Sequence, residues 1–262
     1  MFQGIPLVIG FFDGIHKGHM KLFKGLSKNK FNVLTFTNVP NKNNDFLYSV
    51  QKRIDDLNCL LPNNIFLLDL HNHNMLSMSF VYQLLKTIKP STIIVGQDFR
   101  FGKNRHGDIL QLRKYFKVSV AQINSKYKTS IIKNMLINGN IEQVNKLLIK
   151  PYVITGIVKH GKHLGRKLGY PTANVIFDKN ILIPKSGSYL GYTFVDDKKY
   201  KSAVFIRNNQ LETHIFDFNR NIYDKSISIQ LIKYHKPIKK INNFKTLKKV
   251  IGYKVKEIKE SF

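Results

Sequence analysis

Two histidines stand three residues apart in a glycine-rich run near the start of the chain. They are His16 and His19, in the run Gly-Phe-Phe-Asp-Gly-Ile-His-Lys-Gly-His of residues 10–19. Side chains three apart share one face of a helical turn, and imidazole can donate hydrogen bonds to a phosphoryl group as charge builds on it. A glycine-rich turn with two surface histidines is the alternative. The apolar run before the motif, the Asp13-Gly14 turn and the helix expected after it favour phosphoryl or nucleotidyl transfer.

A second polar loop follows the apolar run Ile-Ile-Val of residues 93–95. It spans residues 96–107 and carries glycines, an acid and two arginines. Arg105 is the candidate phosphate contact because a guanidinium group binds phosphate through two parallel hydrogen bonds. Asp98 either contacts a ligand or only braces the loop, and an ordinary basic surface loop is the alternative.

A third candidate site is a basic loop punctuated by glycines, residues 161–169, followed by Tyr-Pro-Thr-Ala-Asn at 170–174. The backbone N–H groups of such a loop can hold phosphates. Thr172 and Asn174 lie two apart on an expected strand and so point to one face. Their oxygen atoms suit a hard cation such as Mg²⁺. A flexible hairpin without a ligand is the alternative.

The elements that must position the first two loops alternate between strand and helix. Helices are expected over residues 49–61 and 80–88, each ended by a proline, and over 140–149. Alternation of this kind predicts an α/β fold, a doubly wound parallel sheet whose ligands bind beyond the carboxyl ends of the strands. The apolar runs that read as buried parallel strands are residues 7–9, 33–36, 65–68, 93–95 and 118–120.

The pattern changes after Pro151, where we place the domain boundary. Short alternating segments separated by turn residues predict a small antiparallel β-barrel, and residues 244–258 predict a closing helix. The expected strands of the barrel are residues 152–158, 188–195, 200–206, 212–218 and 226–232.

The composition is strongly basic, with 43 Lys+Arg against 16 Asp+Glu and a formal net charge of +27. The lysines are scattered along the whole chain, which predicts a solvated surface that attracts anionic substrates and no specific nucleic-acid site. The single cysteine, Cys59, excludes an internal disulfide, and we expect it to be buried. No apolar run has membrane-spanning length and no signal peptide is recognised, so we expect a cytoplasmic protein without a membrane partner.

The first two segments together resemble a known family. The longer form of the first run, Gly-x-Phe-Asp-Gly-x-His-x-Gly-His, resembles the adenylyltransferase half of bacterial bifunctional riboflavin kinase/FAD synthetases. Loop 96–107 resembles the second signature of the same enzymes, Gly-x-Asp-Phe-x-Phe-Gly-x-x-Arg-x-Gly. The resemblance implies that His16 and His19 are catalytic and that both segments contact nucleotide and flavin phosphate. The implied binding residues are Gly10, Phe12, Asp13, Gly14, Gly18, Gly96, Asp98, Phe99, Gly102 and Arg105.

The segment Lys-Thr-Ser-Ile-Ile-Lys of residues 128–133 resembles a third signature, which opens a helix against the triphosphate. The resemblance implies that Ser130 and Lys133 bind the cofactor. Lys133 stands where the family has arginine, so the charge is kept and the bidentate fork is lost. Taken without the family, the segment indicates an ordinary helix start with Thr129 or Ser130 as the N-cap.

The run Gly-Arg-x-Leu-Gly-Tyr-Pro-Thr-Ala-Asn of residues 165–174 resembles the signature of riboflavin kinases, whose fold is a small β-barrel. The resemblance implies that Thr172 and Asn174 hold the metal. It implies that the cofactor is bound by Gly161, Gly165, Arg166, Gly169 and Pro171, with the loop 161–169 holding the phosphates.

Residues 212–218 resemble the family pattern Glu-x-His-x-x-Asp-Phe. The resemblance implies that Glu212 is the general base on the terminal ribityl hydroxyl of riboflavin, work that a carboxylate beside a metal can do. An exposed strand glutamate is the alternative. Two departures bear on flavin binding: residues 205–210 are shorter than in the family, and Lys236 replaces an arginine of the flavin loop.

We therefore expect an FMN adenylyltransferase domain over residues 1–150 and a riboflavin kinase domain over residues 151–262. The implied substrates are riboflavin, FMN and ATP, with Mg²⁺, in a monomer or weak homo-oligomer. Two alternatives stay open. One half has lost its activity, or the chain is a basic RNA-binding protein.

Overall fold

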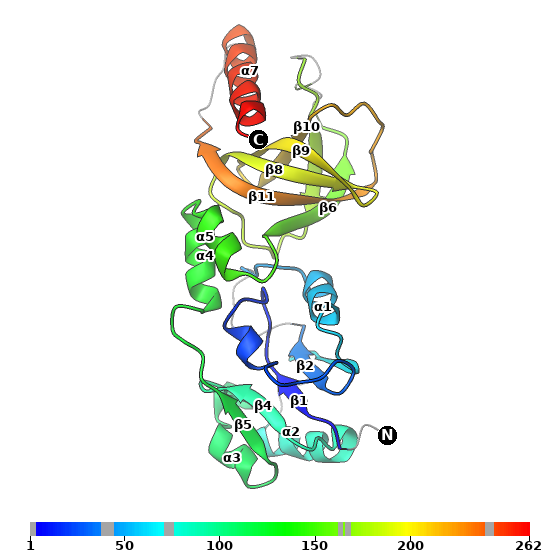
Figure 1. Cartoon of the computed structure of the whole chain (residues 1–262), viewed down its shortest axis with the longest axis vertical. Coiled ribbons are helices and arrows are strands. Elements are labelled where there is room, and N and C mark those ends of the chain that lie inside the picture. The colour runs from blue at the N-terminus through cyan, green and yellow to red at the C-terminus, as the bar shows by residue number, and fades with distance from the viewer. Residues whose placement is uncertain (1–3, 38–44, 71–75, 162–164, 166–168, 239–243) are drawn as a thin grey trace. The chain divides into compact units, whose positions relative to one another are not determined.

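The computed structural model describes residues 4–37, 45–70, 76–161, 165, 169–238 and 244–262 (Figure 1). The chain divides into two compact units, Met1–Thr129 and Ser130–Phe262, and each is described by itself. The first contains a parallel five-stranded sheet and the second a closed antiparallel barrel, so the predicted fold class is confirmed. The functional boundary after residue 150 stays a prediction.

The sheet of the first unit has the strand order β3-β2-β1-β4-β5, and every neighbouring pair is parallel. Strand β1 is apolar and fully buried, as expected of a central strand covered on both faces. Because β2 and β4 flank β1, the strand order reverses between β1 and β4, and open α/β sheets bind ligands at such a point. The strands are β1 (Leu7–Ile9), β2 (Asn32–Phe36), β3 (Asn64–Leu68), β4 (Ile93–Gly96) and β5 (Val118–Ala121).

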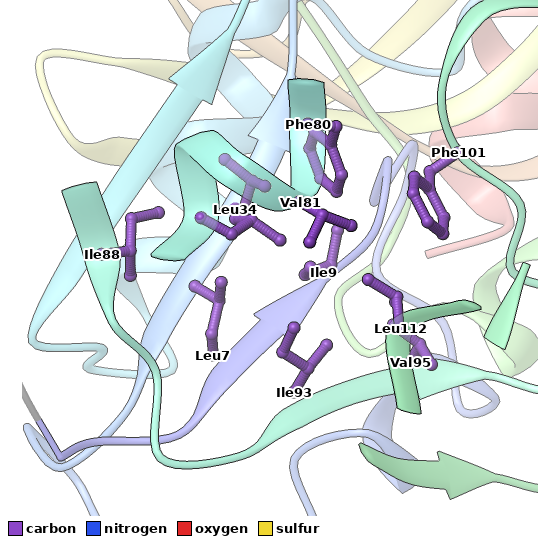
Figure 2. Close-up of a cluster of buried hydrophobic side chains, with 11 residues drawn as sticks. Leu7, Ile9, Leu34, Phe80, Val81, Ile88, Ile93, Val95, Phe101 and Leu112 are labelled. Carbon is purple, nitrogen blue, oxygen red and sulfur yellow. The ribbon is translucent and has the colours of Figure 1, made fainter. Parts of the chain in front are cut away.

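One apolar cluster joins the sheet to its helices (Figure 2). Side chains of β1, β2 and β4 meet those of the helical segment before β4 and of the loop and helix after it. This packing fixes the carboxyl ends of the central strands. The buried members are Leu7, Ile9, Leu34, Phe80, Val81, Leu84, Ile88, Ile93, Val95, Phe101 and Leu112.

Two helical segments of the first unit were predicted from the sequence. Helix α1 (Val50–Asn58) starts where Ser49 Oγ accepts a hydrogen bond from the Lys52 N–H at 3.3 Å. Helix α2 (Ser77–Gln83) continues as the π-helical turn η2 (Leu84–Ile88). The five-residue helix α3 (Ile109–Arg113), which is too short for a clear period, was not predicted.

Two local expectations are wrong. A helix was expected after the histidine motif, but the chain forms only the 3₁₀ turn η1 (His19–Lys21) there. Gly25, a few residues later, has φ of +81°, a left-handed conformation that ends the tight turns after the motif. The second loop contains another short 3₁₀ turn, η3 (Lys103–Arg105). Cys59 is exposed because the buried face of α1 is set by Arg53 and Leu57, one turn apart.

The second unit begins with two helices, α4 (Thr129–Ile137) and α5 (Ile141–Leu147). Helix α5 contacts the barrel strand β11 (Ser226–Lys236). The Asn145 side chain donates to the Leu231 carbonyl at 2.8 Å and accepts from the Tyr152 N–H at 2.7 Å. These two hydrogen bonds fix α5 against the start of the barrel.

The six strands of the barrel close in the order β10-β7-β6-β11-β8-β9. Alternate residues of β6 are buried, which follows from the two-residue period of a strand. Helix α7 (Phe244–Glu260) packs on the barrel through Val255 and Ile258. The remaining strands are β6 (Val153–Lys159), β7 (Ala173–Phe177), β8 (Gly187–Val195), β9 (Lys198–Arg207) and β10 (Gln210–Ile215).

Candidate active sites

Loops at the carboxyl ends of β1, β4 and β5 meet in the first unit. The Lys21 ammonium group in the β1 loop donates to the Gln122 carbonyl beyond β5 at 2.9 Å. The Gln97 side chain beyond β4 makes two hydrogen bonds with the backbone of Ile123, at 3.2 and 3.3 Å. A Cβ on Gly18 would lie 2.9 Å from Ile123 Cγ2, so glycine allows the close approach of two loops.

The two histidine rings of the first motif stack on each other. Their centroids are 3.7 Å apart and their planes differ by 14°. The ring of His16 is buried, with 2% of the residue exposed, whereas His19 is partly buried. The His19 N–H lies 3.2 Å from His16 Nδ1, which acts as an acceptor. The neutral His16 ring then carries its proton on Nε2, where it can be donated to a phosphoryl oxygen.

Burial decides the charge of this pair. Desolvation lowers the pKa of His16 from 6.5 to about 4. Burial also lowers the pKa of His19, and repulsion from His16 adds to this effect. Both rings are therefore neutral at pH 7 and can act as hydrogen-bond donors, but they carry no positive charge.

The other predicted residues of the first motif shape the loop. Phe12 has φ of +53° and lies edge-on to the His19 ring at 5.3 Å. A Cβ on Gly10 would lie 2.7 Å from the Phe12 ring. Asp13 Oδ1 accepts from the backbone N–H groups of Leu47 and Tyr48 at 2.8 and 3.2 Å. Gly14 adopts φ of +75°, which favours glycine.

The loop after β4 is a short closed turn. Phe101 and Gly107 exchange two backbone hydrogen bonds, at 3.0 and 2.8 Å. Gly102 has φ of +73°, and a Cβ there would lie 2.7 Å from Ser77 Cα. Arg105 is exposed, and its N–H donates to the Gly102 carbonyl at 2.9 Å. The turn therefore leaves the arginine exposed in the loop beyond the carboxyl end of β4.

The remaining predicted residues of this loop and of α4 are placed as follows. Asp98 is exposed, and its Oδ1 lies 3.3 Å from where a Cβ on Gly96 would be. Phe99 stacks on Phe101 with centroids 5.9 Å apart. Ser130 and Lys133 lie one helical turn apart on α4, in the second unit. Their phosphate-binding role stays a prediction.

Arg53 is a site residue that the sequence analysis missed. It is 2% exposed and donates to the carbonyl oxygens of Phe11, Phe36 and Thr37 at 3.0, 2.9 and 3.0 Å. Its guanidinium carbon also lies 4.3 Å from the centroid of the Phe11 ring. Arg53 thus ties α1 to the carboxyl ends of β1 and β2. Its signal in the sequence is a basic residue four positions before Leu57, on the apolar face of the helix.

Replacing Arg53 with methionine is expected to lower the free energy of unfolding of the first unit by at least about 3 kcal/mol, because three carbonyl oxygens lose a charged donor. Denaturant titration of the full chain measures this change. Arg113→Met, at an exposed position, is the matched control. An Arg53→Met variant as stable as the control would contradict the role given to Arg53.

The second site joins three oxygen-bearing side chains from two neighbouring strands and the turn before them. Glu212 on β10 lies directly opposite Asn174 on β7. The Thr172 hydroxyl donates to Glu212 Oε2 at 2.8 Å. The three side chains therefore share one face of the barrel wall.

Two predicted glycines border this group. A Cβ on Gly161 would lie 2.3 Å from Asn174 Nδ2, and one on Gly165 would lie 2.8 Å from Thr172 Oγ1. Gly169 has φ of +87°, and Pro171 is exposed. Arg166 lies outside the described residues.

His214 is a second residue without a predicted role. Its Nδ1 lies 2.8 Å from the Pro171 carbonyl, and the ring is edge-on to Tyr170. Burial lowers the pKa of His214, and the hydrogen bond to Pro171 opposes this effect. A neutral His214 donates from Nδ1 and holds the turn that leads to Thr172.

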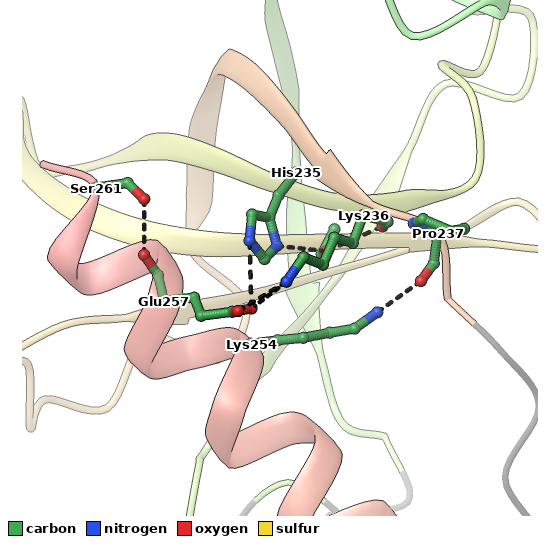
Figure 3. Close-up of polar contacts among 7 residues, drawn as sticks. His235, Lys236, Pro237, Lys254, Glu257 and Ser261 are labelled. Carbon is green, nitrogen blue, oxygen red and sulfur yellow. Dashed lines mark hydrogen bonds and ion pairs between the residues drawn. The ribbon is translucent and has the colours of Figure 1, made fainter.

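The structure gives Lys236 an ion pair. Its ammonium group lies 2.7 and 2.9 Å from the two carboxylate oxygens of Glu257 on α7 (Figure 3). His235 Nε2 lies 3.4 Å from the same carboxylate. In the described residues Lys236 therefore fastens β11 to α7, and its predicted contact with flavin stays a prediction.

Comparisons with known proteins match both halves of the chain. The FAD synthetase family model matches residues 2–135, and the riboflavin kinase model matches residues 148–262. The chain thus combines a nucleotidyltransferase unit of the FAD synthetase class with a riboflavin kinase unit. It belongs to the bifunctional riboflavin kinase/FMN adenylyltransferase family.

Individual relatives support this assignment. The bifunctional riboflavin kinase/FMN adenylyltransferase of Mycoplasma pneumoniae is 30% identical over 98% of this chain and 97% of its own length. The trifunctional protein RibF/MnmA of Mycoplasmoides gallisepticum is 38% identical over 95% of this chain, which spans 39% of that protein's length.

A solved structure shares the fold. The crystal structure titled macrolide-efflux protein, from Streptococcus pneumoniae, has a TM-score of 0.83 at 24% identity and covers 99% of this chain and 95% of its own. At this identity the similarity establishes the fold alone. No helix among the described residues has the length and apolar character needed to cross a membrane.

Proposed function

We propose that the chain converts riboflavin to FMN in its second unit and FMN to FAD in its first, each with one ATP. The observation that carries this proposal is that the residues of both family signatures come together in space. His16 and His19 stack at the ligand-binding edge of the sheet. Thr172, through its hydrogen bond to Glu212, joins the kinase signature to the predicted base.

In the kinase reaction, Glu212 takes the proton of the terminal ribityl hydroxyl. The hydroxyl oxygen then forms a bond to the γ-phosphorus of ATP, and the bond to ADP breaks. The glycine loop of residues 161–169 holds the phosphates. A carboxylate in hydrogen-bond reach of the hydroxyl supplies a factor of about 10² to 10⁴ in rate.

The donor atoms near Glu212 fit Mg²⁺. The Thr172 hydroxyl, the Asn174 amide oxygen and the Glu212 carboxylate are oxygen ligands, which a hard cation prefers. Among the described residues, no group of three or more His, Cys, Asp or Glu side chains is placed to hold a metal. We propose that Thr172 and Asn174 hold Mg²⁺ together with ATP. When bound, the ion neutralises phosphate charge.

In the adenylyl transfer, a phosphate oxygen of FMN forms a bond to the α-phosphorus of ATP, and pyrophosphate leaves. The neutral rings of His16 and His19 donate hydrogen bonds to the oxygens on which charge builds. Arg105 is the proposed cationic contact of the phosphates in the first unit, and the phosphate-binding role that the resemblance gives to Lys133 stays a prediction. Positioning and charge stabilisation provide most of the catalysis in such reactions.

A second candidate function keeps only one of the two activities. The observation that favours it is the ion pair between Lys236 and Glu257. Lys236 replaces the family's flavin-loop arginine, and its charge is already paired within the protein. Under this alternative the kinase half binds riboflavin weakly and the adenylyltransferase half remains active.

Product analysis tests the proposal. The purified full chain is incubated with riboflavin, Mg²⁺ and ATP, and riboflavin, FMN and FAD are separated over time. We expect FMN first and FAD after it. FAD formed only from supplied FMN would support the single-activity alternative, and no product from either flavin would overturn the enzymatic proposal. We propose a cytoplasmic enzyme that is a monomer or weak homo-oligomer.

A further inference from the structure

A glycine occupies the middle of the long C-terminal helix. Gly252 lies eight residues from the start of α7, which spans seventeen residues. Only proline is less favourable than glycine inside a helix, so this position needs another reason. A Cβ on Gly252 would lie 2.7 Å from Tyr170 Oη and 3.3 Å from Tyr170 Cζ. Glycine thus allows the Tyr170 ring to lie directly against the helix backbone.

Tyr170 in turn borders the second site. Its N–H donates to the Gly165 carbonyl at 2.8 Å, and its own carbonyl lies 2.5 Å from where a Cβ on Gly165 would be. Thr172, two residues later, donates to Glu212. The Tyr170 ring also packs against the apolar cluster that contains Val255 of α7. The Tyr170 ring therefore connects α7 to the turn that carries Thr172.

Helix α7 is itself fastened at several points beside Gly252. The Glu257 carboxylate pairs with Lys236, and the Lys254 ammonium group donates to the Pro237 carbonyl at 2.7 Å (Figure 3). Lys259 pairs with Asp217, beyond β10, at 3.0 Å. These contacts hold the part of α7 that follows Gly252, so we expect a larger side chain at residue 252 to displace the Tyr170 ring.

We propose that α7 positions the metal-binding and phosphate-binding turn of the kinase site through the contact between Gly252 and Tyr170. Gly252 is thus a positioning residue for riboflavin phosphorylation, although it lies outside the site. The inference rests on the proposed kinase function. It concerns the placement of Thr172 and leaves the adenylyl transfer independent of α7.

The test compares Gly252→Ala and Gly252→Leu in the full chain. Both residues favour a helix more than glycine does, so a loss of helix is not the expected cause of any defect. We expect kcat/KM for riboflavin phosphorylation to fall about tenfold with alanine and further with leucine, since small misplacements of a site are costly. The Mg²⁺ concentration for half-maximal rate rises, and FAD formation from FMN stays at the wild-type rate.

Rescue distinguishes positioning from general damage. Gly252→Ala combined with Tyr170→Phe removes the Oη atom that the new methyl group meets, and we expect it to regain most of the rate of Tyr170→Phe alone. Lys249→Ala, on the exposed side of α7, is the control for helix changes.

Three outcomes overturn the inference. They are an unchanged kinase rate in both Gly252 variants, no recovery in the double variant, and an equal loss in Lys249→Ala. A wild-type chain without kinase activity would overturn the proposed function itself, and the inference with it.

Discussion

Replacing both His16 and His19 with alanine is expected to abolish FAD formation and to leave FMN formation from riboflavin intact. The rings are stacked and neutral, His16 is buried and His19 is partly buried, and His16 Nδ1 accepts a backbone hydrogen bond. Each ring offers one preorganised donor. Loss of one such donor costs about 10² to 10³ in rate, and loss of two exceeds the range of an ordinary assay. The measurement is FAD formation from supplied FMN and ATP.

The single variants His16→Asn and His19→Asn separate donor loss from cavity formation, because asparagine keeps a polar side chain in a buried place. Lys17→Ala, at the exposed position between the histidines, is the matched control. FMN formation by the same protein reports on the second unit, and thermal unfolding reports on the first. FAD formation at the wild-type rate in the double alanine variant would show that the site is assigned to the wrong residues.

Glu212→Gln is expected to lower riboflavin phosphorylation by about 10² to 10⁴ and to leave FAD formation from FMN unchanged. Glutamine keeps the shape of the side chain and can still accept the hydrogen bond from Thr172. It cannot take a proton at neutral pH. The loss is therefore expected in kcat for riboflavin phosphorylation, measured as FMN released over time at saturating ATP and Mg²⁺.

Glu142→Gln, an exposed carboxylate on α5, is the matched control. Thr172→Val provides a second comparison. It removes one proposed metal ligand and leaves the base in place, so it is expected to raise the Mg²⁺ requirement more than it lowers the rate at saturating Mg²⁺. A Glu212→Gln enzyme that phosphorylates riboflavin at the wild-type rate would exclude Glu212 as the base.

The parts of the fold that could be predicted are those with a strong local pattern. Strand β1 is apolar at every position because it is covered on both faces. The strands of the barrel alternate because one face is buried. Thr172 and Asn174 were expected on one face from their spacing alone, and the structure places Glu212 across from Asn174.

The parts that could not be predicted depend on contacts between distant segments. Arg53 is an ordinary helix residue in the sequence, and only the folded chain brings its guanidinium group to the carbonyl oxygens of β1 and β2. In the sequence, Gly252 is only an unfavourable residue within a helix. The reason for it appears in the folded chain, where Tyr170, far earlier in the sequence, lies against it. The helix expected after His19 failed for a local reason, because tight turns bonded three residues apart replace it.

The proposed kinase site lies on the part of the barrel that has the fewest strand pairings. Strand β7 joins β10 through three residue pairs and β6 through four, whereas β8 and β9 share nine. The residues that meet at the Thr172–Glu212 contact are distant in sequence, and such pairings slow folding because closing the loop between them costs entropy. Kinase activity therefore reports that the barrel has closed. Substrates that bind between β7 and β10 stabilise the closed barrel by mass action. The free energy of unfolding is therefore expected to rise when substrate is bound.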